Sequence, residues 1–143
     1  TCNTPDHRAF DFWVGDWNVT MGGNQAGTNR ITLEEGGCIL HEHWVGALGG
    51  SGQSMNFFDR STGEWNQVWV DRGGGVIRLT GTFVDGTLRY RSVVRRPDGG
   101  TVEHRLLFTP NPDGSVRQLW ETTTDGGKHW AVSFDGLYTK KPG

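Results

Sequence analysis

Long apolar runs are absent from this chain of 143 residues, and none approaches the ~20 residues that a membrane-spanning helix requires. A block of basic charge is absent too, because 14 Lys and Arg stand against 16 Asp and Glu, for a formal net charge of −2. Nucleic acid requires a concentrated positive surface, and the nearest approach to one is the set Arg89, Arg91, Arg95 and Arg96. Arginines that alternate along a strand are typical of a solvated outer face. We therefore expect neither membrane insertion nor a nucleic-acid partner.

The common catalytic motifs are also missing. Neither Ser54 nor Ser92 lies in the strand-turn-helix context that exposes a hydrolase nucleophile. The Gly-Gly pairs lack the following Lys-Ser/Thr and the helix that complete a phosphate-binding loop. The sequence therefore indicates neither an activated nucleophile nor a phosphate site.

A metal site is weakly specified. His41 and His43 share one strand face, with their imidazoles about 7 Å apart along the chain. They could supply two zinc ligands, with a third from His104 or His129. The same face is otherwise apolar, however, and no carboxylate occupies an obvious third position. We expect neither a metal nor haem nor another cofactor.

Cysteine is scarce, with only Cys2 and Cys38 in the chain. In a cytosolic protein two cysteines this far apart usually stay unlinked, but Cys2 lies in an N-terminal tail with little else to hold it. The chain also starts without Met and without a signal peptide, as a mature exported protein does after cleavage. We predict a Cys2–Cys38 disulfide, worth about 3–4 kcal/mol in the chain-entropy model, and an exported bacterial-type protein, periplasmic or secreted.

Glycine is the commonest residue, with 23 copies that fall between short runs of alternating apolar and polar residues. Asp-Gly pairs such as Asp85-Gly86 and Asp113-Gly114 are typical of tight hairpins. The alternation predicts about ten strands, at residues 15–21, 30–34, 38–46, 52–59, 65–71, 76–84, 87–95, 101–109, 115–123 and 129–135.

Strands joined in order by short hairpins form a meander, and closing the meander removes its two exposed edges. We therefore predict one all-β domain over residues 1–143: a closed antiparallel up-and-down barrel, with a two-sheet sandwich as the alternative. Thr4 and Pro5 are typical of a helix start. Phe10, Phe12 and Trp13 then suit a short N-terminal helix that plugs one barrel end.

The chain also resembles a known superfamily. Residues 10–17 read Phe-Asp-Phe-Trp-Val-Gly-Asp-Trp, and the Gly-x-Trp within them resembles the opening of the calycin, or lipocalin-like, barrels. Gly36-Gly37-Cys38, residues 63–67, residues 117–121 and Phe134-Asp135-Gly136 extend the resemblance to a group of exported bacterial lipocalin-like proteins without an assigned function. The resemblance implies a barrel and export, and it implies no catalytic residues.

Glu42 is the candidate for acid–base chemistry. It shares a strand face with Leu40 and Trp44, so an inward orientation would bury its carboxyl among aromatic side chains. Burial raises the pKa of a carboxyl and fits it for general acid or base catalysis. Two other interpretations stay open at this point: Glu42 faces outward, or an arginine such as Arg105 or Arg117 neutralises it.

Amide and aromatic side chains recur together at alternate strand positions, where a barrel filled only for stability would carry Val, Ile and Leu. Polar groups beside aromatic rings are typical of a pocket that orients a partly apolar ligand, although a solid aromatic core with satisfied amides stays open. The candidate ligand-binding residues are Trp44, Asn56, Phe58, Gln67, Trp69, Tyr90, Gln118 and Trp120.

Two functions from different classes follow. The leading hypothesis is a binding protein, monomer or homodimer, for a small, partly apolar ligand of aromatic or isoprenoid type. The alternative is a cofactor-free isomerase, cyclase or lyase that uses Glu42 as its acid or base. A cavity around Glu42 with an aromatic wall and a second proton-transfer group would favour the enzyme, whereas a solid interior would favour a structural domain.

Overall fold

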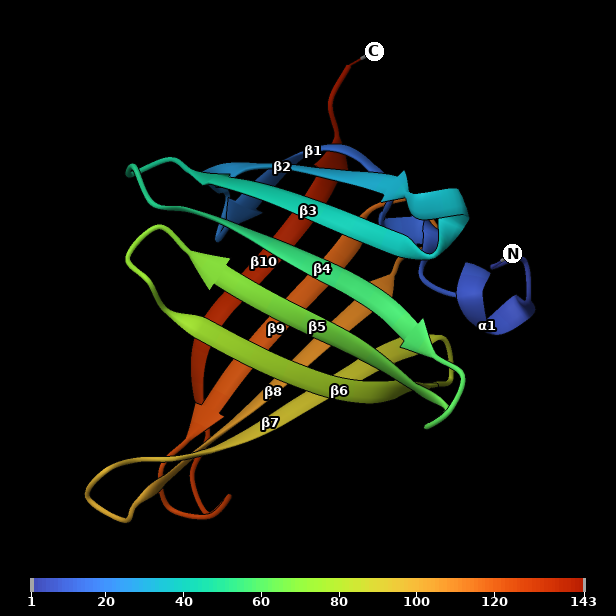
Figure 1. Ribbon diagram of the computed structural model, residues 1–143. Coiled ribbons are helices and arrows are strands. Elements are labelled where there is room, and N and C mark those ends of the chain that lie inside the picture. Colours follow the sequence, from blue (N-terminus) through green and yellow to red (C-terminus); the bar gives the residue numbers. More distant parts are fainter. Residues whose placement is uncertain (1, 143) are drawn as a thin grey trace.

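The computed structural model describes residues 2–142, and the strands within them form a closed barrel (Figure 1). Each strand pairs antiparallel with its neighbour in sequence, and the first strand pairs with the last to close the sheet. The all-β up-and-down barrel is therefore confirmed, and the sandwich alternative is wrong. The strands are β1 (Gly15–Met21), β2 (Asn24–Glu34), β3 (Ile39–Gly46), β4 (Ser51–Asp59), β5 (Glu64–Asp71), β6 (Val76–Val84), β7 (Thr87–Arg95), β8 (Thr101–Pro110), β9 (Val116–Thr123) and β10 (Ala131–Lys140).

The N-terminal segment closes one end of the barrel. Helix α1 (Pro5–Arg8) is capped by Thr4, whose Oγ1 accepts a hydrogen bond from the His7 backbone N–H, and the 3₁₀ turn η1 (Asp11–Trp13) follows it. Phe10 and Trp13 are fully buried and stack with ring centroids 4.9 Å apart. In Figure 1, α1 lies beside the barrel end at which β4 finishes. The predicted N-terminal plug is confirmed.

A disulfide joins Cys2 to Cys38, with the two Cα atoms 5.2 Å apart. Cys38 directly follows the 3₁₀ turn η2 (Glu35–Gly37), where the Arg8 guanidinium donates a hydrogen bond to the Gly37 carbonyl. The predicted pairing is thus confirmed, and it ties the N-terminal segment to the β2–β3 connection. A disulfide indicates an oxidising compartment outside the cytoplasm. None of the helices in residues 2–142 is long and apolar enough to cross a membrane.

Strand boundaries differ from the prediction at β2 and β10. The prediction started β2 at residue 30, but the strand begins at Asn24, because its first half is polar and its inward positions are Gly27 and Asn29. The prediction ended the last strand at residue 135, but β10 runs to Lys140 and buries Tyr138. In both strands inward polar or glycine positions hide the alternation that marks a strand.

The tight turns follow their sequence signals. Between β6 and β7, Asp85 and Gly86 have φ of 51° and 80°, as a two-residue hairpin with both central residues in the left-handed region requires. The β7–β8 hairpin projects past the rest of the barrel on the side away from α1 (Figure 1). The N-terminal segment thus closes one end of the barrel, and the β7–β8 hairpin lies at the opposite end.

Candidate ligand site

The barrel interior is stratified along each strand. On β5, Trp65 contacts Phe10 of the plug, with ring centroids 5.5 Å apart. Gln67 lies two residues further along and Trp69 two residues beyond that, and both line a cavity. Because alternate residues of a strand face the same side, this order repeats around the barrel. Aromatic and aliphatic side chains surround the plug, a layer of polar side chains lies above them, and tryptophans lie above the polar layer.

Glu42 of β3 is the centre of the polar layer. It points inward and is 5% exposed. Its Oε1 accepts a hydrogen bond from Ser54 Oγ at 2.6 Å, and its Oε2 accepts one from Asn29 Nδ2 at 2.7 Å. β3 pairs with β2 and β4, so these donors come from the two neighbouring strands. Both carboxylate oxygens are thereby fixed by groups that can donate a hydrogen bond.

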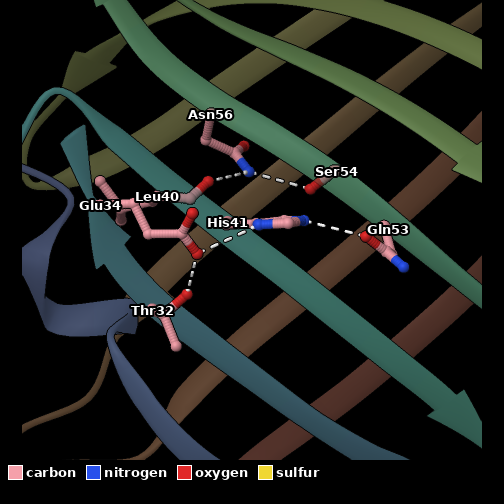
Figure 2. Close-up of polar contacts among 7 residues, drawn as sticks. All are labelled: Thr32, Glu34, Leu40, His41, Gln53, Ser54 and Asn56. Atoms are coloured by element: carbon pink, nitrogen blue, oxygen red, sulfur yellow. Dashed lines mark hydrogen bonds and ion pairs between the residues drawn. The ribbon is translucent and has the colours of Figure 1, made fainter.

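The network continues from Ser54 toward β5 and β7. Asn56 Nδ2 donates to Ser54 Oγ at 2.9 Å and to the Leu40 carbonyl at 3.3 Å, as Figure 2 shows. Asn56 Oδ1 accepts hydrogen bonds from Gln67 Nε2 at 2.9 Å and from the Tyr90 hydroxyl at 3.1 Å. Asn56 is fully buried, so these bonds satisfy an amide that has no access to water.

The other arm of the network runs from Asn29 to β10 and β9. Asn29 Nδ2 also donates to the Tyr138 hydroxyl at 2.8 Å, and that hydroxyl donates to Gln118 Oε1 at 2.6 Å. Asn29 is 2% exposed, and within residues 2–142 its Oδ1 has no hydrogen-bond partner. The arm ends on Gln118, which lines the cavity together with Tyr138.

Burial dominates the electrostatics of this layer. It raises the pKa of Glu42 above the ordinary value, although the hydrogen bonds from Ser54 and Asn29 act in the opposite direction. Burial, reinforced by the charge of Glu42, raises the pKa of Tyr90 and Tyr138 well above 10.0. Both tyrosines therefore remain protonated hydrogen-bond donors at neutral pH.

The arginines suggested as partners of Glu42 lie elsewhere. Arg105 Nε donates to Glu121 Oε1 at 2.8 Å, and Arg117 pairs with both oxygens of Asp135 at 2.9 Å. Among residues 2–142, Glu42 takes part in no ion pair. The interpretations of Glu42 as outward-facing or as neutralised by an arginine are therefore wrong.

Above the polar layer lies a cavity of about 150 Å³, partly open to the surface. We call it the tryptophan cavity. Three indole rings form much of its wall, and Glu42 and the two glutamines contribute polar atoms. Its lining residues are Glu42, Trp44, Gln67, Trp69, Ile77, Leu79, Leu106, Gln118, Trp120, Phe134 and Tyr138.

Inward-facing glycines leave room for the indole rings of the cavity wall to pack against neighbouring strands. A Cβ at Gly52 of β4 would overlap the ring of Trp69, and a Cβ at Gly27 would come within 2.7 Å of the Trp44 ring. Both indoles therefore cover a neighbouring strand and leave the centre open. Trp120 is held differently, because its Nε1 donates to His104 Nδ1 at 3.0 Å. Burial lowers the pKa of His104, which favours the neutral imidazole that this bond requires.

The structure brings most of the sequence-predicted residues together. Trp44, Gln67, Trp69, Gln118 and Trp120 line the tryptophan cavity with Glu42. Asn56 and Tyr90 lie one layer deeper, in the hydrogen-bond network. Phe58 lies near the plug, with its ring centroid 5.2 Å from that of His7.

Sequence reasoning missed Asn29 and Tyr138. Asn29 lies in the polar first half of β2, where no alternation marks the inward face. Tyr138 lies beyond the predicted end of the last strand, although its spacing from Phe134 places both side chains on one face. Extending the period of two past Gly136 would have found it.

His41 and His43 face outward, as expected if Glu42 between them points in. Their ring centroids are 4.0 Å apart, and the His41 ring lies between Glu34, 3.1 Å away, and Gln53, 3.0 Å away (Figure 2). The suggested third ligands are remote, because His104 contacts Trp120 inside the barrel and His129 contacts Asp125 in a hairpin. Within residues 2–142, no three His, Cys, Asp or Glu side chains are grouped as a metal site requires.

No protein-family model matches this sequence, and no curated protein matches it either. The closed antiparallel barrel is compatible with the resemblance to lipocalin-like proteins, a resemblance that concerns architecture and leaves the family open. The functional argument therefore depends on the interior of the barrel.

Proposed function

We propose that this barrel binds a small, partly apolar ligand in the tryptophan cavity. The observation that carries the proposal is a cavity with indole walls directly above a hydrogen-bonded polar layer. Ligand sites in proteins combine mostly apolar walls with a few placed polar groups in this way. Small closed barrels of the lipocalin type hold one ligand in the same part of the fold.

The size of the cavity limits the ligand. At about 150 Å³ it is comparable to engineered cavities that hold one benzene molecule. A single aromatic ring, or the end of a longer isoprenoid-like chain, fits this space. Because the cavity is partly open, the remainder of a longer ligand can extend past the barrel rim.

Two glutamines provide orientation. Gln67 Nε2 donates a hydrogen bond to Asn56 Oδ1, and Gln118 Oε1 accepts one from the Tyr138 hydroxyl. Among residues 2–142, Gln67 Oε1 and Gln118 Nε2 have no hydrogen-bond partner. The cavity thus presents one acceptor and one donor whose positions are fixed by the network, and these groups select a ligand with a complementary polar end.

The disulfide and the resemblance to exported lipocalin-like proteins support a location in the periplasm or outside the cell. A binding protein there would carry or sequester its ligand without a cofactor. Monomer and homodimer are both consistent with a site contained within one barrel.

A second candidate is a cofactor-free isomerase, cyclase or lyase. The observation in its favour is that Glu42 and Tyr138 both line the cavity and are linked through Asn29. A carboxyl with a raised pKa and a second proton-bearing group are what acid–base catalysis needs. Glu42→Gln separates the classes, because such an enzyme loses turnover while its affinity for neutral ligands stays.

Binding of benzyl alcohol, followed by tryptophan fluorescence, tests the leading proposal. The wild type should show a saturable change, and Trp69→Ala should weaken binding by more than the ~1 kcal/mol of a rim contact, since a buried aromatic anchor is lost. Trp130→Ala is the matched control, because Trp130 does not line the cavity. Its ring centroid lies 3.9 Å from Arg105 Cζ. Absence of saturable benzyl alcohol binding to the wild type would contradict the proposed binding function.

A further inference from the structure

Glu42 is the one charged side chain among the residues that line the tryptophan cavity. Two hydrogen-bond donors, Ser54 Oγ and Asn29 Nδ2, are directed at its two oxygens, and donors of this kind favour the ionised carboxylate. Among residues 2–142, no Lys or Arg pairs with it. The fold therefore orients a buried carboxyl group toward the cavity, and within the described residues no basic side chain pairs with it.

The wall of the cavity has matching electrostatics. Five aromatic side chains line it: Trp44, Trp69, Trp120, Phe134 and Tyr138. Aromatic faces carry the negative part of the ring quadrupole and attract cations, with tryptophan the strongest. The ring of Trp69 covers Gly52 and the ring of Trp44 covers Gly27, so both indoles lie along the wall. Walls and floor thus favour the same sign of charge.

An inorganic cation does not suit the tryptophan cavity. Divalent metal ions need several oxygen or nitrogen ligands to replace their hydration shell, and here one carboxylate faces mostly carbon. An organic ammonium group is weakly hydrated by comparison and combines charge with an apolar body. It satisfies the carboxylate and the rings together.

We propose, on the basis of the binding function above, that the ligand of the tryptophan cavity carries a protonated amine or quaternary ammonium group, which pairs with Glu42. Its apolar part, about one ring in size, contacts the indoles. The ammonium hydrogens or methyl groups lie against the carboxylate.

The titration behaviour of the site is consistent with this ligand. Burial raises the pKa of Glu42, and a bound cation supplies the charge partner that restores the ionised form. The other titratable groups that approach Glu42 are Tyr90 and Tyr138, whose pKa values lie well above neutral, and His41, which faces outward from the same strand. Glu42 is thus the group that responds when a cation enters.

The test compares benzylamine, which is protonated at neutral pH, with benzyl alcohol, its neutral counterpart of the same size, by calorimetry. The wild type should bind benzylamine about tenfold more tightly or better, as one desolvated ion pair with cation–π contacts implies. In Glu42→Gln the two affinities should lie within about twofold of each other. Glu103→Gln is the matched control, because Glu103 pairs with Arg91 outside the cavity and its loss changes the net charge equally.

The outcomes distinguish the cationic ligand from the binding function itself. Equal wild-type affinities for the two probes would overturn the cationic ligand while the binding function stands. A preference for benzylamine that persists in Glu42→Gln would assign it to another group and would also overturn the inference. If neither probe binds, both proposals fail together. The wild-type comparison needs no variant, so the test holds even if Glu42→Gln does not fold.

Discussion

At the scale of single residues, Gln67 tests whether the cavity orients its ligand. Gln67→Leu keeps the side-chain volume but removes the hydrogen bond to Asn56 and the free acceptor Oε1. We expect the variant to fold, to bind a purely apolar probe as well as the wild type, and to lose selectivity between benzyl alcohol and toluene. Loss of one buried hydrogen bond to the ligand should cost about 0.5–1.5 kcal/mol of affinity for the alcohol. Unchanged selectivity in fluorescence titrations would show that Gln67 serves only the network.

Glu42 makes a separate prediction about stability and pH. Burial raises its pKa in the folded chain, whereas in the unfolded chain the carboxyl titrates near its ordinary 4.5. The folded state thus keeps this proton to a higher pH than the unfolded state does. The contribution of Glu42 to stability is therefore fully present below pH 4.5 and is lost as the pH rises through the folded-state pKa.

Glu42→Gln cannot ionise, so it lacks this loss. Denaturant titrations from about pH 4 to about pH 8 should show the free energy of unfolding of the wild type falling relative to that of Glu42→Gln. Glu103→Gln, measured alongside, reports what removal of one surface charge does by itself. A difference between wild type and Glu42→Gln that rises with pH would mean that the carboxylate is more stable inside the barrel than in water.

Asn29 illustrates what the sequence leaves undetermined at this scale. The sequence placed Glu42 on the same strand face as Leu40 and Trp44, and that face does point inward. Alternation alone, however, does not say which distant side chains meet a carboxyl. Asn29 and Tyr138 come from β2 and β10, whose approach to Glu42 is fixed by register and closure.

At the scale of elements, the glycine-backed wall predicts an asymmetry between two neighbouring glycines. Gly52→Ala should push the Trp69 ring into the cavity, weaken benzyl alcohol binding and destabilise the fold by about 1–3 kcal/mol, as overpacking does. Gly50→Ala is the control, because its Cβ would meet open space. Equal effects of the two substitutions on binding and unfolding would contradict the role of Gly52.

The N-terminal element makes its own prediction. The disulfide closes a sequence separation of 36 residues, so its loss in a Cys2→Ser/Cys38→Ser variant should lower the free energy of unfolding by about 3–4 kcal/mol. Protein from an oxidising compartment, alkylated without reductant, should gain no mass. Two alkylated thiols would contradict the bridge.

Elements also show how far the sequence carries the fold. Turn chemistry and alternation locate most strands. Asp-Gly pairs mark where strands end, and alternating aromatic residues mark the face that points inward. The first half of β2 and the end of β10 were not predicted. Gly27 and Gly136 leave room for the neighbouring rings of Trp44 and Phe134, and glycine has a low propensity for strands. At these positions close packing against an aromatic ring overrides the local signal for a strand.

At the scale of the whole molecule, closure explains how one chain of modest size both folds and holds an empty space. The plug fills one end with fully buried Phe10 and Trp13, and all strand edges are paired.

The most direct measurement of the central claim follows the seven tryptophan indole N–H signals by NMR during titration with benzyl alcohol. Trp44, Trp69 and Trp120 should shift along saturating curves with one dissociation constant, because they line the cavity. The signals of Trp13, Trp17 and Trp65 should not shift, because these indoles are buried and do not line the cavity. If the three cavity indoles do not shift, or if all seven shift without saturation, the barrel has no ligand site where we place it.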